Sequence, residues 1–124
     1  MSQTPCIFCK IVAGEIPARK VFEDDDVLVF HDIHPQASMH LLMIPKRHVE
    51  NLYDADETHS AVLGKMMTIA GKIAHEQGSP DGFRLVANNG RVGRQEVYHL
   101  HFHLLGGTEP LGSGMNRHLS LIHI

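Results

Sequence analysis

Three histidines in the C-terminal part of the chain alternate with apolar residues and could carry out chemistry. The segment over residues 97–104 reads Val-Tyr-His-Leu-His-Phe-His-Leu, and its histidines are His99, His101 and His103. An alternation with a period of two predicts a β-strand. It places the three imidazoles on one face, about 7 Å from one to the next. The opposite, apolar face is expected to pack on the core.

A row of imidazoles on one strand allows three interpretations. The side chains could simply face solvent. They could bind a metal ion, but zinc–nitrogen bonds are only about 2.0–2.1 Å long, and three side chains in line diverge too far to share an ion comfortably. They could also be catalytic, because a neutral imidazole, with a pKa of about 6.5, can attack an electrophilic phosphorus and leave again.

The segments around the histidines favour the catalytic interpretation. A polar, glycine-bearing loop over residues 89–95 leads into the strand, and its backbone amides could cradle an anion. A second histidine-bearing segment, residues 30–37, precedes His40. Asp32 follows a predicted strand there and could hold a ribose diol, although an aspartate in such a place is more commonly a turn residue.

The only two cysteines, Cys6 and Cys9, form a C-x-x-C pair. Three states remain open for them: a redox pair, two reduced thiols, or half of a zinc site. The βαβ context of a thioredoxin-like redox motif is missing. A structural zinc site needs two further ligands from elsewhere in the chain. Such a site would have no open position for water, so we expect no catalytic metal.

The remaining elements must position these residues. Periodicity and turn signals predict the following order: a short helix over residues 5–13, strands over 21–23, 27–31 and 40–44, a long helix from near Asp54 to Gly78, and strands over 83–88 and 97–105. Asp54 and Glu57 resemble a capping box, and His59 and His75 are expected on the exposed side of the long helix. The acidic run over residues 24–26 could bind a metal but is more typical of a hairpin turn.

The order of elements predicts an α+β fold with a mainly antiparallel sheet of five strands. The 124 residues suit one domain over residues 1–124, with a C-terminal tail from about residue 108. The net charge of −3 gives no basic field for a nucleic-acid partner. Residues 1–5 carry no signal-peptide features, and no apolar run approaches the roughly 20 residues that span a bilayer, so a cytoplasmic protein is expected.

The chain resembles the histidine triad family, in particular its nucleotide-binding protein branch. The motif H-x-H-x-H followed by two apolar residues matches residues 99–105. Further similarity runs through residues 30–48, 83–88, 95–98 and 106–107, and the resemblance as a whole covers residues 6–115. It implies the fold of that family, homodimers, and hydrolysis of purine nucleoside phosphoramidates to nucleoside monophosphates such as AMP or GMP.

The resemblance also implies roles for particular residues. His101 is expected to attack the α-phosphorus, with His103 on the phosphate oxygens, the His99 carbonyl holding the second ring nitrogen of His101, and His40 completing the cluster. Nucleotide binding is expected at these residues and at Phe30, Asp32, Ile33, Asn88, Gly93, Arg94, Gln95 and Glu96. Some bacterial relatives have the same C-x-x-C with two histidines, which implies structural zinc on Cys6, Cys9, His48 and His99.

This sequence departs from the family pattern at two positions near the phosphate. Arg94 stands where close relatives have glycine, so it could add a phosphate contact or disfavour a backbone with positive φ. Glu96 stands where some relatives have serine. Other functions stay open: a non-catalytic nucleotide-binding regulatory module, hydrolysis of dinucleoside polyphosphates, or a zinc hydrolase that uses metal-bound water.

Overall fold

The computed structural model describes residues 6–112, so most of the tail expected from residue 108 onward lies outside the described residues. The elements in chain order are α1 (Ile7–Val12), β1 (Lys20–Glu23), β2 (Val27–His31), β3 (Met39–Pro45), the short 3-10 helix η1 (Glu57–His59), α2 (Ser60–Glu76), β4 (Phe83–Val86) and β5 (Phe102–Gly106). The predicted α+β class and five-stranded sheet are confirmed.

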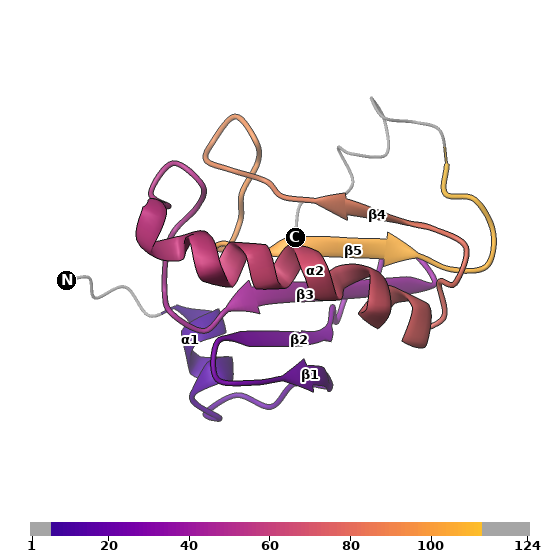
Figure 1. The fold of residues 1–124 in the computed structure, drawn as a ribbon, viewed down its shortest axis with the longest axis horizontal. Coiled ribbons are helices and arrows are strands. Elements are labelled where there is room, and N and C mark those ends of the chain that lie inside the picture. The colour runs from indigo at the N-terminus through magenta and orange to yellow at the C-terminus, as the bar shows by residue number, and fades with distance from the viewer. Residues whose placement is uncertain (1–5, 113–124) are drawn as a thin grey trace.

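One antiparallel sheet carries the fold, with the strand order β1-β2-β3-β5-β4 (Figure 1). β3 lies at its centre, and all seven residues of this strand are buried. A strand covered on both faces reads as a continuous apolar run, which is how residues 39–45 appear in the sequence. β4 and β1 are the two edges of the sheet.

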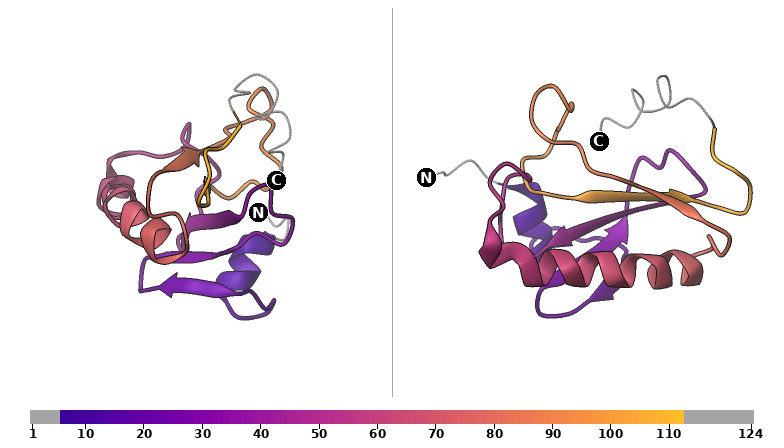
Figure 2. Two further views of the ribbon diagram at one scale, coloured as in Figure 1. Left: turned by 90° about the vertical axis from the view of Figure 1, so that its right-hand side faces the viewer. Right: turned by 45° about the horizontal axis from the view of Figure 1, so that its top comes forward.

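The two helices cover opposite faces of this sheet (Figure 2). On the α2 face, Val29, Leu41 and Met43 pack with the buried Met66 of the helix. On the α1 face, the alternate strand residues belong to a second core cluster, composed of Phe8, Ile11, Leu28, Phe30, Leu42 and Ile44. Because side chains alternate along a strand, each face takes every second residue of β2 and β3.

The predicted strands at the C-terminal end are too long. β4 ends at Val86, and β5 begins only at Phe102, so residues 97–101 precede the sheet in irregular backbone. The Leu100 N–H donates to the carbonyl of Val49 at 2.7 Å instead of to a neighbouring strand. His99 and His101 therefore lie outside the strand, although Phe8 of α1 contacts both rings.

The start of the long helix also differs from the prediction. Its capping box is formed by Asp56 and His59, one turn of 3-10 helix before α2, and not by Asp54 and Glu57. The His59 ring bonds the Asp56 backbone N–H at 3.0 Å, and that role buries a histidine that was expected to be exposed. His75 is exposed as expected.

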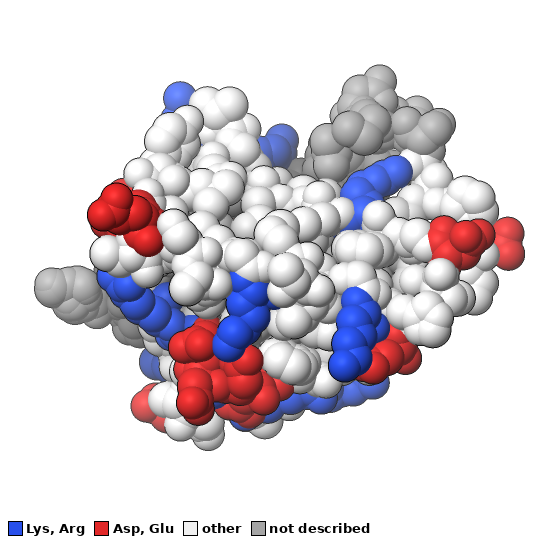
Figure 3. Space-filling view, viewed as in Figure 1, with Lys and Arg blue, Asp and Glu red and all other residues white. Residues whose placement is uncertain are grey.

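The acidic run over residues 24–26 forms the turn between β1 and β2. Asp24 Oδ1 accepts the backbone N–H groups of Asp26 and Val27, each at 2.8 Å. Lys65 of α2 pairs with both Asp24 and Asp26 at 2.9 Å. The face shown in Figure 3 likewise has lysine and arginine beside aspartate and glutamate, with no large area of one sign. Among residues 6–112, no helix is long and apolar enough to cross a membrane.

Candidate active site

Three imidazoles gather on the α1 face of the sheet. In the β3–β5 register His103 pairs with Leu42, a residue of the α1-face core, and His40 projects from β3 to the same side two residues earlier. His40 Nε2 lies 2.8 Å from His103 Nδ1, and the rings of His101 and His103 lie 5.1 Å apart between centroids. All three are at most 2 % exposed. The structure thus brings the predicted His40, His101 and His103 together.

Hydrogen bonds fix which nitrogen of each ring carries the proton. The Gln36 backbone N–H donates to His40 Nδ1 at 2.9 Å, so the proton of a neutral His40 is on Nε2. Burial lowers the pKa of His40 and Asp32 opposes only part of that shift, so His40 is neutral near pH 7. Its Nε2–H then donates to His103 Nδ1, which leaves the proton of His103 on Nε2.

His101 is oriented by the backbone of its own segment. Its Nδ1–H donates to the carbonyl of His99 at 2.7 Å. In the neutral ring the other nitrogen, Nε2, therefore keeps its lone pair. Phe8 of α1 presents its ring edge to His101, with 5.1 Å between centroids and 89° between planes. His101 thus has the tautomer that a nucleophile requires.

A mostly apolar cavity of about 230 Å³ shares Phe8 and Asp32 with the surroundings of these rings, although none of the three imidazoles lines it. Its walls come from α1, the segment after it, β2 and the residues before β5. Four predicted nucleotide-binding residues are among those that line it: Phe30, Asp32, Ile33 and Glu96. Phe8 also lines it and contacts His101, so the cavity and the imidazole cluster are adjacent.

Asp32 supplies a polar group at the boundary of the cavity and the cluster. One oxygen, Oδ1, accepts the backbone N–H of His34 at 2.8 Å and closes a turn. The other oxygen, Oδ2, is buried, lies 3.4 Å from His40 Nε2 and accepts no hydrogen bond. A buried acceptor without a donor is uncommon and calls for a partner. Asp32 is consequently both a turn residue and a potential ligand-binding residue.

The loop over residues 89–95 is rigid because one side chain ties it together. Gln95 Oε1 accepts from the Gly90 N–H and from Asn51, and Gln95 Nε2 donates to the carbonyls of Glu50 and Val97. Both the oxygen and the nitrogen of the Gln95 carboxamide are thus hydrogen-bonded within the protein. The predicted contact of Gln95 with a ligand could be made only by its backbone. Neither Gln95 nor the predicted Asn88, Gly93 and Arg94 line the apolar cavity.

Arg94 adopts the left-handed backbone that glycine favours, with φ at 63°. It is the only non-glycine residue with positive φ among residues 6–112. The arginine thus adopts a conformation that glycine would hold without strain, at a cost of about 1–2 kcal/mol.

Replacing Arg94 with glycine should therefore stabilise the protein. The relief of strain exceeds the extra chain entropy of glycine by about 0.5–1 kcal/mol, which urea unfolding would measure as an increased free energy of unfolding. Arg91→Gly is the matched control in the same loop, and it should lower stability because Arg91 has ordinary φ. A destabilised Arg94→Gly protein would mean that the arginine side chain makes a stabilising contact.

The predicted zinc ligands also come together. His99 Nδ1 lies 3.3 Å from Cys6 Sγ and 3.6 Å from Cys9 Sγ, and His48 Nδ1 lies 3.3 Å from Cys9 Sγ. Zinc bond lengths of 2.3 Å to sulfur and 2.0–2.1 Å to nitrogen give sulfur–nitrogen edges of about 3.6 Å in a tetrahedron. The His99 Nε2–H donates to the Pro45 carbonyl at 2.7 Å, which leaves Nδ1 free to bind a cation.

The donor set is of a kind that zinc prefers, with two sulfurs and two imidazole nitrogens. Without a cation, burial and the neighbouring Cys6 sulfur raise the pKa of Cys9 to about 11, so metal binding would have to displace the proton of this thiol. These four residues fit a closed structural metal site, with no position left for a reactive water.

A second group of potential ligands, Asp32, His40 and His103, also lies within 4.8 Å between donor atoms. The hydrogen bonds argue against a metal there. His40 Nδ1 accepts from a backbone amide, so the nitrogen that faces His103 and Asp32 carries the proton. A metal on that nitrogen would require an imidazolate. The residues fit a hydrogen-bond relay better than a metal site.

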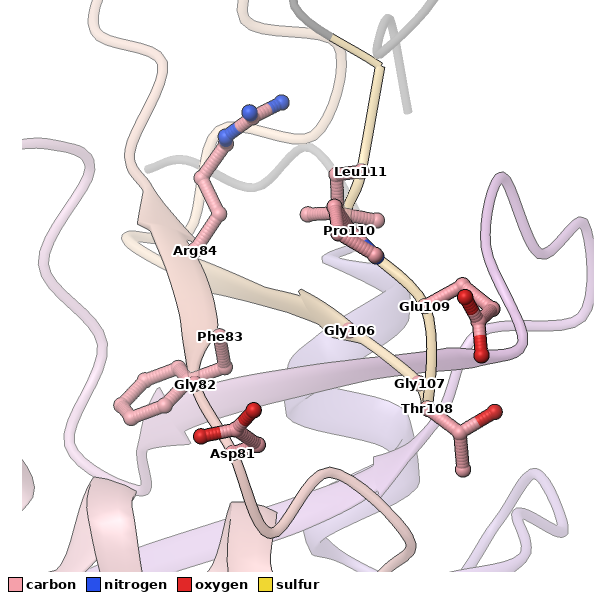
Figure 4. A pocket seen from close by; sticks show the side chains of 10 residues that line it. All are labelled: Asp81, Gly82, Phe83, Arg84, Gly106, Gly107, Thr108, Glu109, Pro110 and Leu111. Carbon is pink, nitrogen blue, oxygen red and sulfur yellow. The ribbon is translucent and has the colours of Figure 1, made fainter.

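A larger hollow of about 360 Å³ lies beyond the far end of β5, where β4 begins (Figure 4). Polar side chains surround it, but those of Asp81, Arg84 and Glu109 point in different directions. Ligand sites usually have polar groups that converge on one point. His103 lies near the start of β5, whereas Gly106 at the strand's end lines this hollow. We therefore assign the chemistry to the smaller cavity.

One functional residue was missed in the sequence. Phe8 contacts His101, His99 and Phe30 and lines the apolar cavity. The helical spacing of residues 7–12 marked it only as a core residue. Its position between Cys6 and Cys9, the two cysteines whose expected zinc site also includes His99, was the signal that could have placed it beside the histidines.

Comparison with known proteins agrees with this site. A family model described as "Scavenger mRNA decapping enzyme C-term binding" matches residues 5–118. A purine nucleoside phosphoramidase of Escherichia coli is 50 % identical over 107 residues, which cover 86 % of this chain and 89 % of that protein. Adenylylsulfatase HINT1 of Arabidopsis thaliana is 46 % identical over 110 residues, covering 87 % and 75 % of the two chains.

The fold has solved counterparts as well. A crystal structure of a HIT family hydrolase from Legionella pneumophila superimposes with a TM-score of 0.82 at 47 % sequence identity. The match covers 88 % of this chain and 98 % of the other.

Proposed function

Because the chain belongs to the histidine triad family, we propose that it is a hydrolase that cleaves the phosphorus–nitrogen bond of purine nucleoside 5′-phosphoramidates. One observation carries the proposal: His101 donates through Nδ1 to the His99 carbonyl, so Nε2 is the nitrogen that keeps the lone pair for attack. The phosphoramidase named among the relatives, at 50 % identity, supports the reaction class.

The reaction has two steps, both centred on His101. Its Nε2 attacks the α-phosphorus, the bond from phosphorus to the amine breaks, and the amine leaves with a proton taken from solvent. Water then attacks the same phosphorus, the bond to Nε2 breaks, and a nucleoside monophosphate is released. The water that attacks in the second step returns its protons to solvent. Because the Nε2–H of His103 points away from His40, we assign it to a phosphate oxygen, where it stabilises the charge that develops.

The nucleotide would occupy the apolar cavity next to the rings. The base would lie between Phe8, Phe30 and Ile33, which offer aromatic and aliphatic surface. Asp32 Oδ2, a buried acceptor without a donor, would accept from the ribose hydroxyls. The rigid loop over residues 89–95, with Asn88 before it and Glu96 after it, would lie on the phosphate side.

The four residues Cys6, Cys9, His48 and His99 would hold structural zinc. When bound, the ion would join α1 to the segment before β5. Four protein ligands complete a tetrahedral zinc site and leave no coordination position for water. The alternative mechanism through metal-bound water is therefore disfavoured.

A covalent adduct tests the proposed function. Incubation with an AMP-linked amine and rapid acid-free denaturation should yield protein heavier by one adenylyl group, and peptide mapping by mass spectrometry should place that group on His101. AMP should accumulate in parallel. Binding of AMP without any turnover would support the non-catalytic nucleotide-binding module instead, and turnover confined to diadenosine polyphosphates would support that alternative substrate class.

We also propose a homodimer of this single domain, residues 1–124. The edge strand β4 leaves Phe83 and Leu85 partly exposed on a row of unpaired backbone groups, which is the kind of edge that a second copy can cover. Sedimentation equilibrium should give about twice the chain mass of 13.8 kDa. A mass equal to one chain at micromolar concentration would contradict the dimer.

A further inference from the structure

His99 takes part in two sites at once. Its ring nitrogen Nδ1 lies 3.3 Å from Cys6 Sγ and 3.6 Å from Cys9 Sγ, while its backbone carbonyl accepts the Nδ1–H of His101 at 2.7 Å. One residue thus connects the cysteine–histidine cluster to the imidazole that we assign as the nucleophile. A rotation of the His99 backbone would move the acceptor that orients His101.

The sheet does not fix this carbonyl. β5 begins at Phe102, so residues 97–101 lie outside the strand ladder. The side chain of His99 is held by the Pro45 carbonyl at 2.7 Å and by the two sulfurs, and its ring packs edge to face on His48 with 4.9 Å between centroids. The side-chain anchors of His99 act together with one backbone bond, because the Leu100 N–H of the same peptide unit donates to the Val49 carbonyl at 2.7 Å. The position of the His99 carbonyl therefore depends on both, and Val49 directly follows His48 in the chain.

Phe8 forms a second connection between the same two groups. It lies between Cys6 and Cys9 in the chain, and its ring packs against both His99 and His101, with centroid distances of 5.9 Å and 5.1 Å. Phe8 lies in the first turn of α1, whose N-cap is Cys6, so the position of its ring depends on how the two cysteines are held. The cluster therefore contacts His101 through the side chain of Phe8 as well as through the backbone of His99.

We propose that Cys6, Cys9 and His48 are positioning residues for catalysis: by gripping the His99 ring, the occupied cluster holds His101 in the orientation for attack. This inference rests on the proposed function, since it concerns the same nucleophile. In-line attack needs the lone pair of Nε2 to point at phosphorus, and small misplacements of a reacting group cost about tenfold to a hundredfold in rate. The loss of the cluster should lower kcat more than nucleotide affinity.

His48→Ala is the most informative variant, because His48 is exposed and does not line the cavity. The substitution removes one ligand of the cluster without opening the core. His75→Ala, an exposed histidine on α2, is the matched control. For each protein we would measure bound Zn²⁺ by elemental mass spectrometry, kcat and KM with an AMP-linked amine, and the Kd of AMP. The Nδ1–H proton of His101 in the NMR spectrum reports its bond to the His99 carbonyl without any turnover.

In support of the proposal, His48→Ala should lose Zn²⁺, its kcat should fall about tenfold or more, and its Kd for AMP should stay within about twofold. The His101 Nδ1–H signal should shift or broaden, and His75→Ala should match the unmodified protein. Should His48→Ala retain Zn²⁺, Cys9→Ser takes its place under the same criteria.

Metal loss with unchanged kcat and an unchanged His101 signal would overturn the proposal. So would a parallel loss of kcat, AMP affinity and cooperative unfolding, since that pattern describes a purely structural site. Absence of turnover in the zinc-loaded unmodified protein would instead refute the proposed function. In that case the response of the His101 signal to Zn²⁺ removal would still show whether the cluster controls the orientation of His101.

Discussion

Replacing His101 with alanine should abolish the turnover of a purine nucleoside phosphoramidate while the protein still binds AMP. In the proposed intermediate the imidazole forms the only covalent bond between the protein and phosphorus. Its loss should therefore lower kcat by about 10³-fold or more. The base and ribose contacts assigned to Phe30 and Asp32 do not involve this ring. Affinity for AMP, measured by calorimetry, should therefore change far less than the rate.

Two observations control for a folding defect in this variant. Because the ring is buried, thermal unfolding should show a lower midpoint but a cooperative transition. The adenylyl adduct should also be absent from the mass spectrum. Turnover close to that of the unmodified protein would refute His101 as the nucleophile and would direct attention to His103.

Gly93→Ala should damage both stability and catalysis. A β-carbon at this position would lie 2.6 Å from the carbonyl oxygen of Asn89 and 2.7 Å from its nitrogen. Both are backbone atoms of a loop that Gln95 holds rigid, so neither can move aside cheaply. Overpacking of this kind costs about 1–3 kcal/mol, and we expect a value in the upper half of that range from urea unfolding.

The rate should fall as well, because the same loop leads through Glu96 into the segment that carries His99 and His101. Gly64→Ala is the matched control. Gly64 lies inside α2, no atom would lie within 4 Å of the added carbon, and alanine in a helix is favoured by about 0.5–1 kcal/mol. A Gly93→Ala protein with unchanged stability and rate would show that the loop rearranges freely.

Most of the fold could be predicted from local patterns. The apolar runs of β2 and β3, the helical periodicity of α2 and the aspartates of the first turn each have a short-range physical cause. The helix start was placed at the wrong aspartate, because Asp54 and Asp56 both suit a cap and only the bond from His59 distinguishes them.

The site was predicted less evenly, since its parts depend on contacts between distant residues. Period-two alternation over residues 97–104 suggested one strand, yet His99 and His101 precede β5, and His99 Nδ1 lies 3.3 Å from the sulfur of Cys6, which is 93 positions distant in the chain. The proximity of Cys6, Cys9, His48 and His99 followed from the resemblance alone. The role of Phe8 and the internal use of the Gln95 carboxamide become visible only when the chain is folded.

The division of the sheet into an α1 face and an α2 face has a consequence for how this protein can be altered. Neighbouring residues of β3 serve opposite sides: His40 belongs to the reactive side, whereas Leu41 packs under α2. Deleting a single residue before His40 would shift the strand register by one and exchange the side chains on its two faces. The imidazole of His40 would then lie in the apolar core under α2. Substitutions under α2, in contrast, offer an engineer room to tune thermal tolerance while the chemistry across the sheet stays as it is.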